Sequence, residues 1–291
     1  MIKNALHSVK VIFLDVKVKQ KMKIYGKYLP LLFISLFAFL IVATGCNPDE
    51  RVKIIEKPIK SAKDIIPITD SLVIPYVYTS AVSLNNLPVA EKKRKFFDMM
   101  LPAILAAKED LALTLKKVDL LSLKSELTSD EKLFIENLKE KYNATNIAMV
   151  KSRLHTFPVC IVLAQAAIES AWGTSRFFLE ANNPFGLWSF DPDQDRIEAS
   201  STRKGTKVYL RKFNNLEDAI DAYFTTLSTG PFVKFRAARL KTSDPFTLIN
   251  YLIDYSERRE AYVEEVKQVI TGNNLVMYDT YRISPEYIVG N

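Results

Sequence analysis

The most apolar stretch of the chain after its N-terminal segment is Val159-Cys-Ile-Val-Leu-Ala-Gln165-Ala-Ala-Ile-Glu169-Ser-Ala-Trp172-Gly173, in which Glu169 is the only charged residue. Its apolar residues recur at helical spacing, which predicts a buried helix with Gly173 in a C-cap position. On such a helix Glu169 lies at the edge of the apolar face, one turn from Gln165 and three residues before Trp172.

This placement gives Glu169 a candidate role in catalysis. A carboxyl group held against an indole, in a place that water reaches poorly, should have a raised pKa. A raised pKa keeps the carboxyl protonated, as the general acid of glycoside cleavage must be; lysozyme is the standard example of this arrangement. A glutamate at a helix edge is, by itself, more often a solvated surface residue, so the neighbouring motifs must carry the assignment.

The rest of the chain predicts an α+β fold that is mostly α. Of its 291 residues 48% are apolar and 25% are charged, and only 8 are glycine, so repeat folds and all-β folds with many turns are disfavoured. Helical spacing occurs at 96–115, 216–227 and 260–270, and a capping box at 128–131 predicts a helix start. We expect a kink or break at Pro102, a helix with Pro245 at its first position, and a strand at 208–210.

The N-terminal residues have the pattern of a bacterial lipoprotein signal. Residues 1–45 contain seven lysines and one aspartate, and an apolar run from Leu29 leads to Ala43-Thr-Gly-Cys46. We expect lipidation of Cys46 and translation from Met22; an uncleaved N-terminal anchor is the alternative. The predicted divisions are a signal at 1–45, a lipid-anchored tether at 46–87, helices at 88–150 that pack on the catalytic domain, and the catalytic domain at 151–291.

Charge and cysteine content exclude several classes of function. The net charge is +7, of which the leader supplies +6, so the remainder lacks the basic surface that nucleic acid requires. Cys160 has no partner once Cys46 carries lipid, and its apolar neighbours predict a small core residue. His7 and His155 are the only histidines, which argues against a Cys-His protease or a histidine-rich metal site.

The segment Asn182-Asn-Pro-Phe-Gly-Leu-Trp188 adds a second candidate feature. Aromatic rings stack on sugar faces, and amides bond N-acetyl groups, so this composition suits a sugar polymer. A turn carrying core aromatic residues is an equally good interpretation of the segment alone.

Several motifs, in this order, resemble one family. They are Glu169-Ser-Ala-Trp-Gly-Thr-Ser-Arg-Phe, Asn182-Asn-Pro-Phe-Gly-Leu-Trp, Phe213 with Asp218-Ala-Ile-Asp-Ala-Tyr223, Phe235-Arg-Ala-Ala-Arg239 and Tyr255-Ser-Glu-Arg-Arg-Glu-Ala-Tyr262. The chain resembles the glucosaminidase domain of Bax-type proteins, in the peptidoglycan-hydrolase group of glycoside hydrolase family 73. The likeness covers roughly 200 of 291 residues, from about residue 88.

The resemblance implies a lysozyme-like fold in which Glu169 protonates the leaving oxygen of a β-1,4 bond after N-acetylglucosamine. It also implies a tyrosine near the cleft, which we assign to Tyr255, with Tyr262 packing its helix. The predicted substrate-binding residues are Gln165, Trp172, Asn183, Phe185, Gly186, Trp188 and Tyr223.

The sequence departs from the family pattern at three places. Ala171 replaces a usual glycine, and Phe232 stands where relatives commonly have tyrosine. The second carboxylate has no clear match: Glu198 is the first candidate, and Asp193 and Asp195 are others. Alternatively, the 2-acetamido oxygen of the substrate attacks the anomeric carbon and no second carboxylate is needed.

The predicted function is therefore an endo-β-N-acetylglucosaminidase that cleaves peptidoglycan glycan strands. A lytic transglycosylase and a non-catalytic glycan-binding lipoprotein are the alternatives. We expect a monomer in the cell envelope, held by lipid at Cys46, with the outer membrane or periplasm favoured over the inner membrane. No cofactor is expected and no metal, because Asp191-Pro-Asp-Gln-Asp195 lacks the glycine and glutamate of a calcium loop.

Overall fold

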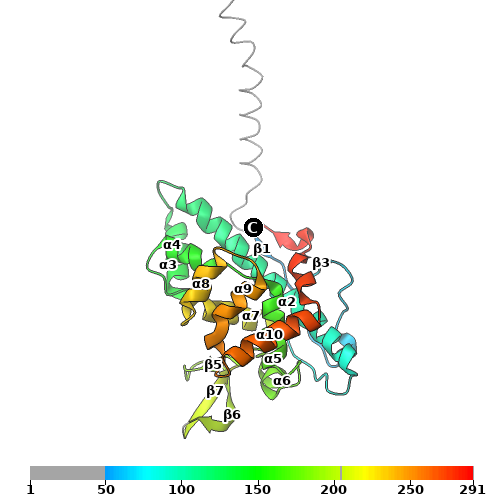
Figure 1. Ribbon diagram of the computed structural model, residues 1–291. Coiled ribbons are helices and arrows are strands. Elements are labelled where there is room, and N and C mark those ends of the chain that lie inside the picture. Colours follow the sequence, from blue (N-terminus) through cyan, green and yellow to red (C-terminus); the bar gives the residue numbers. More distant parts are fainter. Residues whose placement is uncertain (1–49, 204, 291) are drawn as a thin grey trace, which may run out of the picture. The chain divides into compact units, whose positions relative to one another are not determined.

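The computed structural model describes residues 50–203 and 205–290 (Figure 1). The predicted signal at 1–45, the start at Met22 and the lipidation at Cys46 lie outside these residues. The described part forms one compact unit, in which the helices before residue 150 pack on those after it. Of the described residues 54% are in helices and 12% are in strands, which confirms the expected α+β, mostly α class.

The longest helix is α2 (Val89–Ser122), and it runs through Pro102 without ending. The predicted break is therefore wrong. Proline removes one helical hydrogen bond and costs about 3 kcal/mol in a helix interior. Residues 96–107 are all buried, and their packing against α4, α5 and α7 outweighs that cost.

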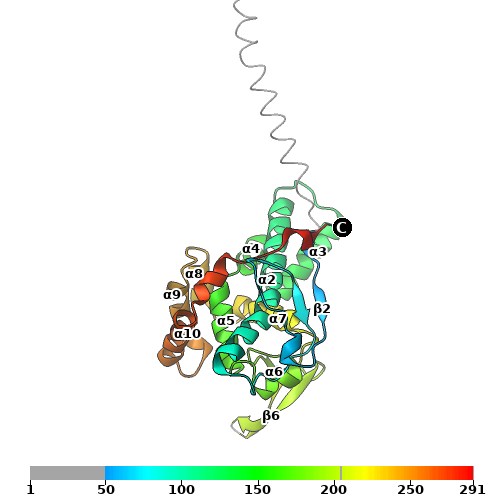
Figure 2. The same cartoon turned by 90° about the vertical axis from the view of Figure 1, so that its right-hand side faces the viewer.

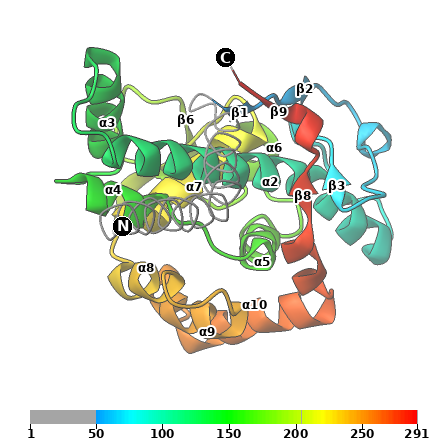
Figure 3. The same cartoon turned by 90° about the horizontal axis from the view of Figure 1, so that it is seen from above.

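Three further helices lead to the predicted catalytic segment. Helix α3 (Ser129–Lys141) begins at the expected capping box, in which Thr128 and Glu131 satisfy each other's backbone N–H groups. Helix α4 (Ile147–Leu154) is capped by Asn146. Helix α5 (Val159–Glu169) is buried along nearly its whole length. Figure 3 looks down α5, which lies between α2 on one side and α9 and α10 on the other.

A small antiparallel sheet follows α6 (Arg176–Ala181). Its strands are β5 (Trp188–Ser189), β6 (Arg196–Arg203) and β7 (Thr206–Arg211), in the order β5-β7-β6. The strand expected at 208–210 is part of β7. The sheet projects beyond α6 at the lower end of Figures 1 and 2.

The C-terminal part is again helical. The elements are α7 (Leu216–Thr229), α8 (Val233–Arg239), α9 (Pro245–Ile249), η2 (Asn250–Tyr255), α10 (Glu260–Gly272) and η3 (Leu275–Thr280). Pro245 is the first residue of α9 and Asp244 caps it, as expected. Within the described ranges no single helix is long and apolar enough to cross a membrane. Helices α4 and α5 are long and apolar enough only when taken together, and the chain bends by 69° between them.

The described part of the predicted tether, residues 50–87, is folded onto the domain. Strand β1 (Arg51–Val52) pairs with β9 (Ile288–Val289), and β3 (Leu72–Val73) pairs with β8 (Arg282–Ile283). Strand β2 (Ile55–Lys57) pairs with β4 (Tyr76–Tyr78), and two short turns, η1 (Ala62–Asp64) and η4 (Pro285–Tyr287), complete the region. The prediction missed this because strands of two or three residues have too little alternation to identify.

The folded segment should contribute measurable stability. Val77 of β4 is fully buried, so Val77→Ala should lower the free energy of unfolding by about 2 kcal/mol, measured by urea titration. Leu72 lies in the same segment but is 52% exposed, and Leu72→Ala should cost less than about 0.5 kcal/mol. Equal, negligible effects of both variants would mean that the segment is a free tether.

Candidate active site

Helix α5 ends at Glu169, and the side chain of Ser170 shapes the turn that follows. The Ser170 hydroxyl donates to the carbonyl of Ala166 at 2.6 Å and accepts from the N–H of Gly173 at 2.9 Å. Ser170 is fully buried. The helix was expected to continue through Trp172, but it stops earlier: the Trp172 N–H bonds back to the carbonyl of Ala167, and the Ser170 hydroxyl takes the Gly173 N–H in place of a helical carbonyl.

The turn contains three consecutive residues with positive φ. These values are 49° at Ala171, 59° at Trp172 and 75° at Gly173. A glycine is needed at Gly173, since a Cβ there would lie 3.0 Å from Phe96 and 3.2 Å from Phe178. Positive φ also explains why the family pattern has glycine where this chain has Ala171.

Trp172 fastens this turn to helix α2. Its ring packs edge-on against Phe96 and Phe97, with centroids 6.0 and 5.7 Å away, and the Lys93 ammonium lies 4.6 Å above it. These contacts give Trp172 a packing role. Because residue 172 lies outside the helix, its predicted i+3 position beside Glu169 is wrong.

Glu169 is partly buried, and burial raises the pKa of its carboxyl above the ordinary glutamate value. The Tyr262 hydroxyl, as a hydrogen-bond donor, and the positive charge of Arg258 oppose this rise. The charge of Glu265 on α10 adds to it. Arg258 and Glu265 pair with each other at 2.6 Å, so their effects on Glu169 offset one another in part.

Behind Glu169, Gln165 joins two tyrosines. The Tyr223 hydroxyl donates to Gln165 Oε1 at 2.5 Å, and Gln165 Nε2 donates to the Tyr262 hydroxyl oxygen at 2.9 Å. The Tyr262 proton is then free to face Glu169. Gln165 and Tyr223 are fully buried, so they support the site from behind. Their predicted direct contact with substrate is not compatible with this burial.

Tyr255 packs on Tyr262, the second tyrosine of this network. Their rings stack at 13°, with centroids 5.6 Å apart, and burial raises the pKa of both phenols, to which the charge of Glu169 adds. Tyr262 is buried and hydrogen-bonded, whereas Tyr255 is partly exposed and makes ring contacts with Tyr223 and Phe232. The sequence interpretation gave Tyr262 packing alone and missed its hydrogen bonds, because helical spacing shows burial but not where a hydroxyl points.

The amides at 182–183 hold their own loop. Asn183 donates to the carbonyls of Leu187 and Arg211, and its oxygen accepts from the N–H of Leu187. Asn182 bridges in the same way to Thr79 and Phe213. Both amides are buried, so they shape the loop and do not bind N-acetyl groups directly.

The aromatic rings in and just after the loop at 182–188 differ in exposure. Phe185 is buried and stacks on Tyr223 at 4.0 Å, and Gly186 takes a φ of 63° next to it. Trp188 is 40% exposed and lies 6.0 Å from Phe190, which is 85% exposed. Trp188 and Phe190 therefore offer ring faces to a ligand, and the sequence interpretation missed Phe190.

The candidates for a second carboxylate lie on the projecting sheet. Glu198 on β6 is exposed and pairs with Lys207 at 3.0 Å, while its carbonyl accepts from Arg176. Asp193 and Asp195 are exposed in the preceding turn, where the Asp193 N–H donates to Asp191. Burial, Tyr262, Arg258 and Glu265 shift the Glu169 pKa, and none of the three candidate carboxylates is among its influences. The described ranges contain no cluster of three metal-ligating side chains.

Cys160 is a buried free thiol near the start of α5. Burial and the nearby Asp279 carboxylate raise the thiol pKa, which makes the nucleophilic thiolate scarce. Its predicted core position is confirmed.

Comparison with known families agrees with this geometry. Residues 144–275 match the model of the glucosaminidase family, described as mannosyl-glycoprotein endo-β-N-acetylglucosaminidase. These residues form a glucosaminidase-family domain. The domain includes Glu169, Gln165 and both tyrosines of the stacked pair.

Two relatives match part of the chain. The chain is 30% identical over 118 residues to protein bax of Escherichia coli, covering 38% of this chain and 40% of that protein. It is 29% identical over 141 residues to the exo-glucosaminidase LytG of Bacillus subtilis, covering 45% and 46%. The match thus spans less than half the length of either relative.

Solved structures with a partial likeness include two bacterial proteins. The catalytic domain of the autolysin Auto from Listeria monocytogenes has a TM-score of 0.37 at 18% identity, covering 56% of this chain and 95% of that domain. A peptidoglycan hydrolase from Sphingomonas sp. A1 has a TM-score of 0.35 at 21% identity, covering 48% and 86%.

The two tyrosines should respond differently to loss of their hydroxyls. Tyr262→Phe removes the donor that lowers the Glu169 pKa and leaves Gln165 Nε2 unpaired. It should cost about 1–3 kcal/mol in urea titration and move the alkaline limb of activity to higher pH. The Tyr255 hydroxyl makes no hydrogen bond with the described residues, so Tyr255→Phe should leave stability within about 0.5 kcal/mol.

The same two variants, Tyr255→Phe and Tyr262→Phe, also test which tyrosine hydroxyl takes part in the reaction. If Tyr255 contacts substrate, Tyr255→Phe lowers kcat while stability is kept. Unchanged kcat in Tyr255→Phe would exclude a catalytic hydroxyl at that position.

Proposed function

We propose that this chain hydrolyses peptidoglycan glycan strands as an endo-β-N-acetylglucosaminidase, with Glu169 as general acid. The observation that carries the proposal is the Glu169 carboxyl, whose pKa is raised by burial and which lies within a glucosaminidase-family domain. The exposed Trp188 and Phe190 rings supply stacking surface for sugars.

In the first step the protonated Glu169 gives its proton to the glycosidic oxygen, and the bond from that oxygen to the anomeric carbon breaks. The carboxylate that results faces the Tyr262 hydroxyl and the Arg258 charge, both of which favour its charged form. These groups therefore stabilise Glu169 after the proton has left, while burial keeps it protonated before.

Glu169→Gln keeps the shape of the side chain and removes the acid. We expect activity on purified peptidoglycan to fall at least about 100-fold, with products of residues 48–291 followed by mass spectrometry after borohydride reduction. The intact protein should release fragments ending in reduced N-acetylglucosamine. Products lighter by one water would instead identify a lytic transglycosylase, and binding without release would identify a glycan-binding protein.

The pH dependence follows from the direction of the Glu169 pKa shift. Activity needs the protonated acid, so it should fall as pH rises through the raised pKa. The unfolded glutamate ionises at lower pH than the folded one, so Glu169 also lowers folding stability across that interval. Glu169→Gln should therefore lose activity without losing stability at neutral pH. A variant destabilised by more than about 1 kcal/mol there would contradict the assigned shift.

Two routes complete the reaction, and Glu198 distinguishes them. In one, Glu198 acts as a base that activates water. In the other, the substrate's acetamido oxygen attacks the anomeric carbon, and water then opens the resulting ring. The Lys207 pairing and exposure of Glu198 favour the second route.

Glu198→Gln should therefore keep activity within about threefold of the parent chain in the same peptidoglycan assay. Lys207→Gln, which removes the partner, is the matched control for disturbance of the β6–β7 pair. A loss of 100-fold or more in Glu198→Gln alone would make Glu198 the base.

We further propose that the protein is a monomeric lipoprotein of the cell envelope, attached through Cys46 on the outer-membrane or periplasmic side. Four residues separate Cys46 from β1, and four residues span at most roughly 14 Å. A lipidated chain would thus hold its domain near the membrane surface, well short of the reach that a free tether would allow. Radiolabelled palmitate should be incorporated by the parent chain and not by Cys46→Ser; equal labelling would refute the anchor.

A further inference from the structure

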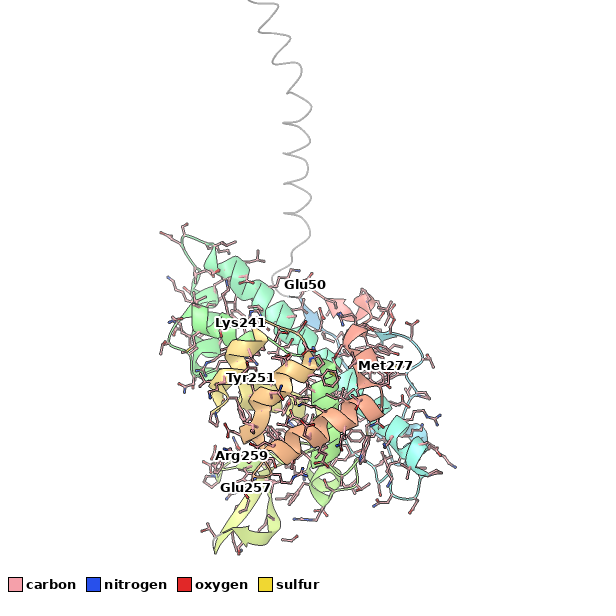
Figure 4. The ribbon with its side chains drawn as sticks, in the orientation of Figure 1. Glu50, Lys241, Tyr251, Glu257, Arg259 and Met277 are labelled. Carbon is pink, nitrogen blue, oxygen red and sulfur yellow. The ribbon has the colours of Figure 1, made fainter. Side chains whose placement is uncertain are left out.

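A cavity lies at the other end of α5 from Glu169. It measures about 460 Å³, is open to solvent on one side, and is lined by α2, the residues just before α5, the connection from α8 to α9, and the segment from η3 to β8. Helix α5 has 11 residues, so at 1.5 Å per residue the two ends are roughly 15 Å apart. In Figure 4, Lys241 marks the α8–α9 connection, whereas Glu257 and Arg259 mark the turn before α10 at the lower end.

Arg239 lines this cavity as a buried cation without an acidic partner. Its side chain is 7% exposed. Nη2 donates to the carbonyls of Ser152 and Arg153 and to the Ser228 hydroxyl, which places it at the C-terminal end of α4. Nε and Nη1 have no acceptor among the described residues and are closed off from solvent, so an anion in the cavity would act on them through its charge and not through a hydrogen bond. Burying a guanidinium that is only partly satisfied is unfavourable unless a negative charge lies nearby.

The other charged groups of the cavity do not supply that charge. Lys108 and Arg282 are positive, and Asp279 and Glu109 are negative, so with Arg239 the lining has a net charge of +1. Asp279 is engaged with the N–H of Cys160 at 2.9 Å. Lys108 donates to the carbonyl of Phe157 at 2.5 Å, and burial lowers its pKa to about 8. An added negative charge would offset Arg239 and favour the charged form of Lys108.

The remaining lining indicates which kind of anion fits. Leu105, Phe157 and Ile283 give the cavity apolar walls, and Thr156 and Tyr281 add hydroxyls. A single negative charge balances the net charge of the lining, and the apolar walls suit a short hydrocarbon group. We propose that this cavity binds a small organic acid through its carboxylate group, as a site separate from the glycan site. This proposal is independent of the proposed hydrolase activity.

The test measures thermal stability of residues 48–291 with butyrate as the probe, at constant ionic strength set by chloride. Butyrate at 50 mM should raise the Tm by at least about 2 °C. The gain should be lost in Lys108→Met and in Arg282→Gln, and kept in Lys241→Gln, which alters an exposed lysine outside the cavity. Arg239→Gln is not the first choice, because it also removes the bonds that end α4.

A second readout follows Lys108 directly. Bound butyrate raises the pKa of its ammonium, so acylation of Lys108 by an amine-reactive reagent, measured by peptide mass, should slow at least about threefold. Acylation of Lys241 should not change. A Tm in butyrate no higher than in chloride of the same ionic strength, or a gain kept in both cavity variants, would overturn the site. A gain from phosphate and none from butyrate would overturn its assignment to carboxylates.

Discussion

The buried hydroxyl of Ser170 sets the position of the candidate acid. It donates to the carbonyl of Ala166 and accepts from the N–H of Gly173. These two hydrogen bonds hold the turn in which α5 ends at Glu169 and the chain reverses through three residues of positive φ. If the helix continued past Glu169, residue 172 would be helical and would not have the position from which Trp172 packs on α2. The turn therefore links the aromatic core of the first half of the domain to the chemistry of the second half.

The second constraint is the buried amide of Gln165. An amide has one acceptor and one donor side, and here each side is used by a different tyrosine. The Tyr262 hydroxyl oxygen accepts from Gln165, which leaves its proton for Glu169. The site thus contains opposed effects: burial favours protonated Glu169, and Tyr262 with Arg258 favours the carboxylate. A group that must hold a proton and then release it needs both.

Sequence patterns predicted the parts of this structure that depend on local chemistry. The capping box at 128–131, the proline at the start of α9 and the apolar face of α5 each depend on a few neighbouring residues. The family motif pointed to Glu169 in the same local way, and its catalytic role stays a prediction. Patterns failed where distant segments meet. Strands β1 and β3 exist because β9 and β8 lie beside them, and their two-residue length leaves no periodicity to detect.

The same reason explains the errors within the site. Asn183, Tyr223 and Gln165 were expected to face substrate because their residue types suit sugars, yet each is satisfied by a partner from another element. Residue type does not reveal whether a polar group is already paired inside the fold. Tyr262 shows the converse, since helical spacing predicted its burial but not the hydrogen bonds that its hydroxyl makes.

The proposed role of Glu169 requires its carboxyl to keep a proton at a pH where an ordinary glutamate has lost it. Carboxyl carbon NMR of the selectively labelled chain, titrated in pH, follows this group alone when Glu169→Gln is used to assign its signal. A midpoint above the ordinary glutamate pKa, coinciding with the alkaline limb of activity, is the predicted result. A midpoint at or below the ordinary value would contradict the account, because the carboxyl would then have no proton to give.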